Sequence, residues 1–197
     1  MNLLQPACST TFTALGDWHR VGITQYHLKN FEAAATAYQN LVARDPKYAD
    51  AWLNLGRMLY EQNKLDDALE AYHKARALRP NDRKTLYMIG RILVAKNQWD
   101  RAIEILDTQV KRDTLATESW LLLAQAHRHK GDTKNAQEAL ATYIGAQGDR
   151  PEGWAEYFEL GKLYQGHIDA AQTIYRSVLK MLPSNKEVQD SLHTVSN

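Results

Sequence analysis

The sequence predicts an all-α protein, built as a row of about five helical hairpins followed by a capping helix. Tryptophan recurs at multiples of 34 residues, at Trp18, Trp52, Trp120 and Trp154, and Leu86 occupies the remaining place of the series. A small residue follows four positions later in the first four units, at Gly22, Gly56, Gly90 and Ala124. Apolar residues around these places follow helical spacing. Recurrence at a fixed period is typical of stacked hairpins, because each hairpin buries its apolar side against its neighbours.

The chain begins with a segment that lacks such a pattern. Residues 1–14 show no sustained period and are rich in serine and threonine, so we expect a poorly ordered lead-in. The first hairpin is expected over residues 15–48, where Trp18, Val21 and Gly22 lie 34 residues before Trp52, Leu55 and Gly56.

The second hairpin, residues 49–82, has the clearest pattern. Its first apolar stripe consists of Trp52, Leu55, Gly56 and Leu59, and its second consists of Ala68, Tyr72 and Ala75. Asn63 and Lys64 predict the turn between the two helices, and Pro80 predicts the end of the second. Together these residues resemble the tetratricopeptide repeat, a family whose pattern of Trp, Leu, Gly, Tyr, Ala, aromatic, Ala and Pro is met here except at Leu59.

Three more units and a cap follow the same frame. Hairpins are expected over residues 83–116, 117–150 and 151–183. In the last of these, Ala171, Tyr175 and Val178 fit one residue late, so its first helix is expected to be a residue longer or bulged. Residues 184–197 predict a capping helix, opened by a capping box of Ser184 and Glu187 and docked through Val188, Leu192 and Val195.

The resemblance implies a right-handed α-solenoid whose concave surface, lined by the first helix of each hairpin, binds a segment of a partner protein. Arg57 and Arg91 stand at the same place in adjacent hairpins and are suited to carboxylates, with tyrosines beside them for apolar side chains. The candidate partner-binding residues are Arg20, Tyr26, Asn54, Arg57, Tyr60, Lys84, Tyr87, Arg91 and Arg128. The heat-shock carboxylate clamp of this family is not expected, because only Asn54 and Lys84 match it.

Composition restricts the other classes of function. The 197 residues include 24 basic and 23 acidic side chains, so no overall charge favours nucleic acid or a membrane surface. Cys8 is the single cysteine, which excludes an internal disulfide and fits the cytoplasm. There is no signal-peptide pattern and no apolar run of membrane-spanning length, so we expect no membrane insertion.

No pattern of catalytic or cofactor-binding residues is present, so we expect no enzyme activity, no metal and no cofactor. His127 and His129 are two apart on a predicted helix and point to different faces, so they are not expected to share a metal.

The function expected is that of an adaptor, scaffold or assembly chaperone. Its partner is a protein or peptide that is acidic or has a free carboxylate, and the chain itself is a monomer or a weak homo-oligomer. The alternative is a structural or regulatory subunit that self-associates or docks through its outer face and C-terminal helix.

Overall fold

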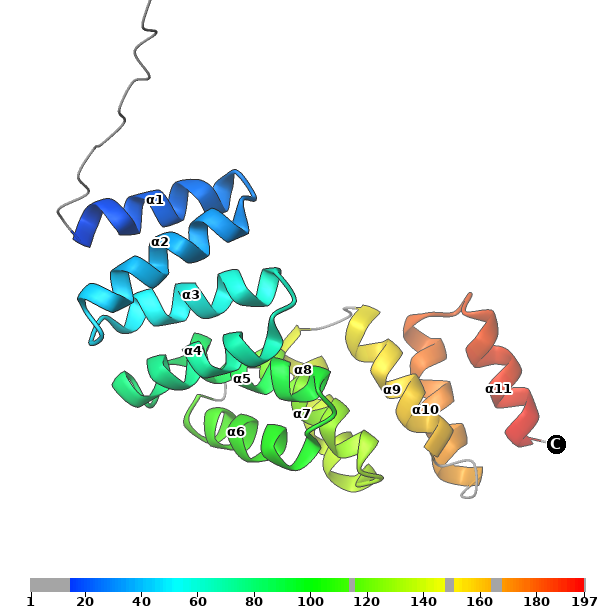
Figure 1. The fold of residues 1–197 in the computed structure, drawn as a ribbon. Helices are drawn as coiled ribbons and strands as arrows, with labels where there is room; N and C mark the ends of the chain where they lie inside the picture. Colours follow the sequence, from blue (N-terminus) through cyan, green and yellow to red (C-terminus); the bar gives the residue numbers. More distant parts are fainter. Residues whose placement is uncertain (1–14, 114–115, 148–150, 164–167, 197) are drawn as a thin grey trace, which may run out of the picture. The chain divides into compact units, whose positions relative to one another are not determined.

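The computed structural model describes residues 15–113, 116–147, 151–163 and 168–196 (Figure 1). These described residues form eleven α-helices and no strand, which confirms the predicted all-α fold of paired helices. The helices are α1 (Leu15–His27), α2 (Phe31–Arg44), α3 (Ala49–Glu61), α4 (Leu65–Leu78), α5 (Arg83–Ala95), α6 (Trp99–Arg112), α7 (Thr117–His129), α8 (Thr133–Gln147), α9 (Pro151–Leu163), α10 (Ile168–Met181) and α11 (Lys186–Ser196). The predicted lead-in, residues 1–14, lies outside the described residues.

The chain divides into two compact units, Met1–Thr85 and Leu86–Asn197. In the first unit, α1 to α4 lie side by side, as Figure 1 shows. Close approach of paired helices depends on glycine: a Cβ atom added to Gly56 would lie 2.9 Å from Cε1 of Tyr72, a distance that real Cβ atoms do not show. Tyr72 and Ala68 of α4 are fully buried there. The repeated small residue therefore allows a large aromatic ring to fill the space between the two helices.

The turns inside the first four hairpins share one backbone geometry. Lys29, Asn63, Asn97 and Gly131 have positive φ values of 57°, 59°, 56° and 75°, and each lies 34 residues after the one before. A single residue in the left-handed region reverses the chain, and the following helix starts within two residues. In the first hairpin Asn30 caps α2, because its side-chain oxygen accepts a hydrogen bond from the Ala33 backbone N–H at 3.2 Å.

The fifth hairpin, in the second unit, departs from the common frame. Its first helix, α9, is described over Pro151–Leu163, and the residues that follow Leu163 lie outside the described part of the chain, so a longer or bulged helix stays a prediction. In α10 the shifted frame is confirmed, because Ala171, Tyr175 and Val178 are fully buried.

Gly161, which the sequence analysis missed, takes the place of the close-contact glycine in this hairpin. A Cβ atom there would lie 2.5 Å from Cε1 of Tyr175. The residue 34 positions after Ala124 is Phe158, which lies about one helical turn before Gly161. Phe158 is instead a buried ring whose centroid lies 5.5 Å from that of Tyr175. The contact face of α9 is therefore displaced by one turn along the helix.

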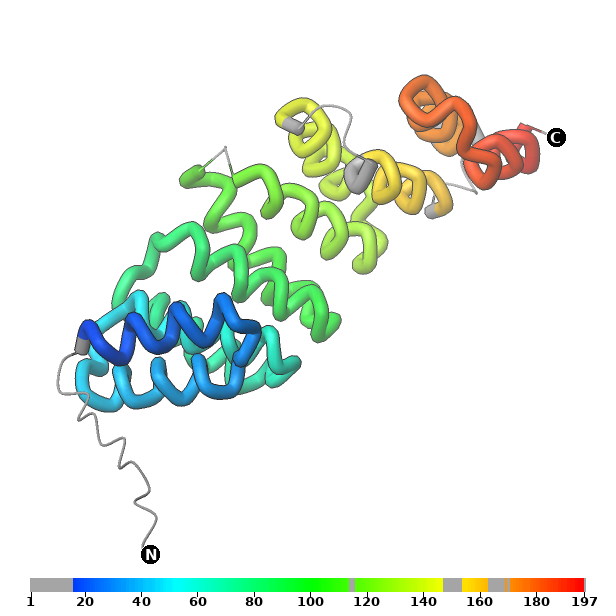
Figure 2. Tube along the Cα trace, turned by 90° about the horizontal axis from the view of Figure 1, so that it is seen from above, coloured from blue at the N-terminus to red at the C-terminus, as the bar shows by residue number. Residues whose placement is uncertain are grey.

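The last helix, α11, docks on α10 as the sequence predicts, but it begins differently. Figure 2 shows α10 and α11 as neighbours, and Val188 of α11 is fully buried. The N-cap is Asn185, whose side-chain oxygen accepts from the Val188 backbone N–H at 3.2 Å, so the predicted capping box of Ser184 and Glu187 is wrong. Exposed polar residues such as Gln189 and Asp190 cover the other side of α11. None of the described helices is both long and apolar enough to span a membrane.

Candidate functional site

A groove in the first unit brings together three of the predicted partner-binding residues, Tyr26, Asn54 and Arg57. It has a volume of about 270 Å³ and is called here the N-terminal groove. Its lining residues come from α1, α2 and α3 and are Ile23, Tyr26, His27, Tyr38, Asn54, Arg57 and Met58. Three further predicted residues of this unit, Arg20, Tyr60 and Lys84, are not among the lining residues.

Arg57 is held in this groove by an aromatic partner from the neighbouring hairpin. Its guanidinium carbon lies 4.3 Å from the centroid of the Tyr26 ring, and its Nη2 atom donates a hydrogen bond to the Tyr26 hydroxyl. The residue remains exposed, so N–H groups that do not face the ring stay accessible to a ligand. A guanidinium positioned in this way presents several parallel donors, the arrangement that carboxylates bind.

The floor of the groove is apolar and neutral. Tyr38 is 2% exposed, and burial raises its pKa to about 12, with the nearby Tyr48 adding to the effect and Arg57 opposing it. Its phenol therefore carries no charge at neutral pH. Met58 is also buried, whereas Ile23 on α1 is 40% exposed, a high value for a large apolar side chain. An apolar ligand side chain would find contacts here beside the Arg57 cation.

Tyr38 and Met58 also line the groove, although they were not among the predicted binding residues. The signal for Met58 was its place one turn after Asn54 on the same helix face. The signal for Tyr38 was its spacing from Gly22, which equals that of Tyr72 from Gly56. In the structure, a Cβ atom added to Gly22 would lie 2.6 Å from the Tyr38 ring. Tyr38 and Met58 are thus buried packing residues that also form part of the groove lining.

The other predicted residues differ in their surroundings. Arg20 is exposed and forms an ion pair with Asp17 at 2.6 Å on its own helix. On α5, Lys84 and Arg91 are exposed and Tyr87 is half-buried; the expected equivalence of Arg57 and Arg91 stays a prediction. Arg128 is different, because it forms an ion pair with Glu156 of α9, and the two side chains are only 17% and 11% exposed.

A second groove, which sequence analysis did not predict, lies in the second unit. This C-terminal groove has a volume of about 540 Å³. Its lining residues come from the neighbourhood of α7, α9, α10 and α11 and are Gln125, Trp154, Ala155, Glu156, Phe158, Glu159, Val178, Leu182, Asn185 and Glu187. Three of them are glutamates, and none of these described lining residues is a lysine or arginine.

The histidine pair on α7 is divided between two different contacts. Nδ1 of His127 lies 3.1 Å from Oδ2 of Asp132, and this imidazole is 13% exposed. The ring of His129 stacks on Trp99 of α6, with centroids 4.3 Å apart and planes 3° from parallel. No group of three or more His, Cys, Asp or Glu side chains in the described part of the chain is placed to hold a metal ion.

Comparisons with known proteins point to one family. Three family models described as tetratricopeptide repeat match residues 22–83, 59–120 and 117–149. A search of curated protein sequences found no match.

Several solved structures resemble this chain in fold. A MamA structure is 19% identical and covers 88% of this chain and 94% of its own, with a TM-score of 0.79. YrrB, described as a TPR protein with an unusual peptide-binding site, is 16% identical, covers 91% of each chain and has a TM-score of 0.77. A tetratricopeptide repeat protein from Parabacteroides merdae is 12% identical, covers 92% of this chain and 72% of its own, and has a TM-score of 0.78.

Proposed function

Because the chain belongs to the tetratricopeptide repeat family, whose members generally serve in protein–protein interaction, we propose that it is a non-enzymatic interaction module that binds an acidic segment of a partner protein in its N-terminal groove. An adaptor, a scaffold and an assembly chaperone all work in this way. The peptide-binding site in the description of YrrB, a protein of similar fold, supports a binding role for this scaffold.

The observation that carries the proposal is the placement of Arg57. Its guanidinium is fixed over the Tyr26 ring and its side chain remains exposed. Preorganisation of this kind lowers the entropy lost when a carboxylate binds. Asn54 adds an amide to the same lining, and Ile23 and Met58 add apolar contacts. The occupant that fits these groups is a segment with a carboxylate next to an apolar side chain.

The predicted residues of α5, Lys84, Tyr87 and Arg91, stay candidate partner-binding residues in the proposal. The alternative, self-association through the outer face and α11, is less well supported, because Val188 is buried within its own chain and the other side of the helix is polar.

A cytoplasmic location remains part of the proposal and rests on the single cysteine.

The test uses a ten-residue acetylated and amidated peptide with two leucines and two glutamates at its centre. We expect binding to the full-length protein that weakens with added salt. The single variant Arg57→Glu and the double variant with Arg91→Glu should each bind less tightly, with about 1.5 to 3 kcal/mol lost for each charge-assisted contact removed. Fluorescence anisotropy measures the affinity, and thermal melting measures the fold.

The control introduces the same change of charge elsewhere. Lys74→Glu and Lys180→Glu alter exposed lysines that line neither groove, so they should leave affinity unchanged apart from a small long-range effect. The Arg57 change removes an exposed cation–π contact, so it should cost no more than about 1 kcal/mol of stability. Equal affinity of the folded Arg57→Glu protein and the control would refute the proposed site.

A further inference from the structure

The C-terminal groove combines an apolar floor with an acidic rim. Phe158 and Val178 of its floor are buried, and Trp154 and Leu182 complete the apolar lining. The volume of about 540 Å³ lies within the range of pockets that bind a side chain or a small ligand. Above this floor stand the carboxylates of Glu156, Glu159 and Glu187. Such a lining favours an occupant that is apolar and positively charged.

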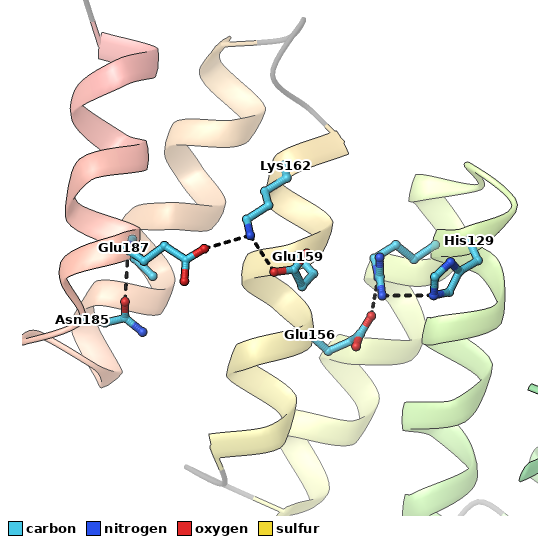
Figure 3. Close-up of polar contacts among 8 residues, drawn as sticks. His129, Glu156, Glu159, Lys162, Asn185 and Glu187 are labelled. Carbon is cyan, nitrogen blue, oxygen red and sulfur yellow. Dashed lines mark hydrogen bonds and ion pairs between the residues drawn. The ribbon is translucent and has the colours of Figure 1, made fainter. Parts of the chain in front are cut away.

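Two glutamates at the rim already bind the ammonium group of Lys162. Lys162, which is on α9 and is not itself a lining residue, donates from Nζ to Oε1 of Glu159 at 2.7 Å and to Oε1 of Glu187 at 3.0 Å. The same nitrogen lies 4.5 Å from the centroid of the Phe158 ring. Figure 3 shows Lys162 reaching between the two glutamates, one on its own helix and one on α11. Two carboxylates and an aromatic face form a binding site for an ammonium ion.

The charge balance leaves this site acidic. Glu156 is neutralised by its ion pair with Arg128. Lys162 supplies one positive charge to two carboxylates, and hydrogen bonds from its ammonium to Glu159 first and Glu187 second raise its pKa. One negative charge therefore remains on the pair. Glu187 is 69% exposed and Lys162 34%, so an incoming cation can reach the contact and compete for it.

We propose that the C-terminal groove binds a basic, apolar segment of a partner protein, in which a lysine takes the contact of Lys162 with Glu187 while a neighbouring large apolar side chain packs against Trp154 and Phe158. This binding extends the proposed interaction function to a second site with the opposite charge preference. It rests on residues of the second unit alone, so it does not depend on Arg57. The two grooves select different sequences, so each sets its own requirement on a partner.

The experiment uses the peptide described above with its two glutamates replaced by lysines, and a second form with glutamines in the same places. Both are titrated into the ¹⁵N-labelled full-length protein. The lysine peptide should shift amide signals of α9 and α11 and bind at least about tenfold more tightly than the glutamine peptide. The glutamate peptide, which tests the N-terminal groove, should leave these signals unchanged. The absence of binding at one groove can thus be distinguished from the absence of binding at the other.

Variants then test the two carboxylates and the internal lysine. Glu159→Gln combined with Glu187→Gln should weaken binding of the lysine peptide at least about tenfold, whereas Lys162→Gln should strengthen it severalfold because the competing ammonium is gone. The matched control is Glu104→Gln with Glu138→Gln, two exposed glutamates of α6 and α8 outside the groove. A merely structural role of Lys162 predicts no gain. The proposal is overturned if the glutamine peptide binds equally well, if the control weakens binding as much, or if the lysine peptide shifts no signal of α9 or α11 at millimolar concentration.

Discussion

Tyr38 links the packing of the first hairpin to the floor of the N-terminal groove, and its ionisation gives a test of that packing. Its pKa is raised from about 10 to about 12, mainly by burial. Between these pH values the folded chain keeps a proton that the unfolded chain loses, so this contribution to stability is complete below about pH 10 and is lost as the pH rises toward 12. We expect about 2 kcal/mol of the free energy of unfolding to disappear by pH 11.5.

The measurement is urea unfolding at pH 9 and pH 11.5, for the wild type and for Tyr38→Phe. Other groups titrate in this range as well, so the difference between the two proteins isolates the tyrosine. The variant should lose less stability over the same interval, because it has no phenol to ionise. Parallel losses in both proteins would mean that Tyr38 is not buried as described.

At this scale the sequence predicted side chains on a shared surface better than it predicted their partners. Tyr26, Asn54 and Arg57 line one groove, as their places in the repeat indicated. Arg128 also has the expected place on its helix, yet its cation is bound by Glu156, 28 residues later and on another hairpin. The Arg128–Glu156 pair depends on the position of α9 along its axis, and the repeat pattern of the sequence does not give that position.

At the scale of helices, the start of α11 has two candidate N-cap residues. Ser184 and Asn185 are both good N-cap residues, and Ser184 with Glu187 matches a capping box. The structure uses Asn185, and the Glu187 side chain contacts Lys162 instead. We expect Asn185→Ala to destabilise the protein by about 1 kcal/mol and Ser184→Ala to have almost no effect. Thermal or urea unfolding measures both, and the reverse order would restore the capping box.

The displaced contact face of α9 shows why an apolar stripe alone cannot fix the register of a hairpin. Trp154 and Tyr157 are three residues apart, so they lie on the same side of the helix and either can be counted as the first aromatic of the repeat. The spacing of Tyr157, Leu160 and Gly161 repeats that of Trp52, Leu55 and Gly56. This second match was the available signal, and the fully buried Leu160 agrees with it.

At the scale of the whole molecule, the array needs a polar surface at its end, where no further hairpin packs. Val188 covers part of α10, and α11 presents polar residues outward. Deleting residues 184–197 should expose apolar surface of α10, lower the melting temperature and promote self-association. Calorimetry and light scattering measure the two effects, and Val188→Ser in the full-length chain should produce part of the same loss. A truncated protein that stays monomeric with an unchanged melting temperature would contradict this role for α11.

The turns inside the hairpins have a consequence for how this sequence can diverge over evolution. The same left-handed backbone is formed by Lys29, by Asn63 and Asn97, and by Gly131. Glycine adopts it without cost, asparagine at a small one, and lysine at about 1 to 2 kcal/mol. The same backbone geometry thus occurs with three residue types at the four turns. Sequence drift at these turns is limited by the stability of the neighbouring helices, so a well-packed hairpin tolerates substitutions that a marginal one would lose.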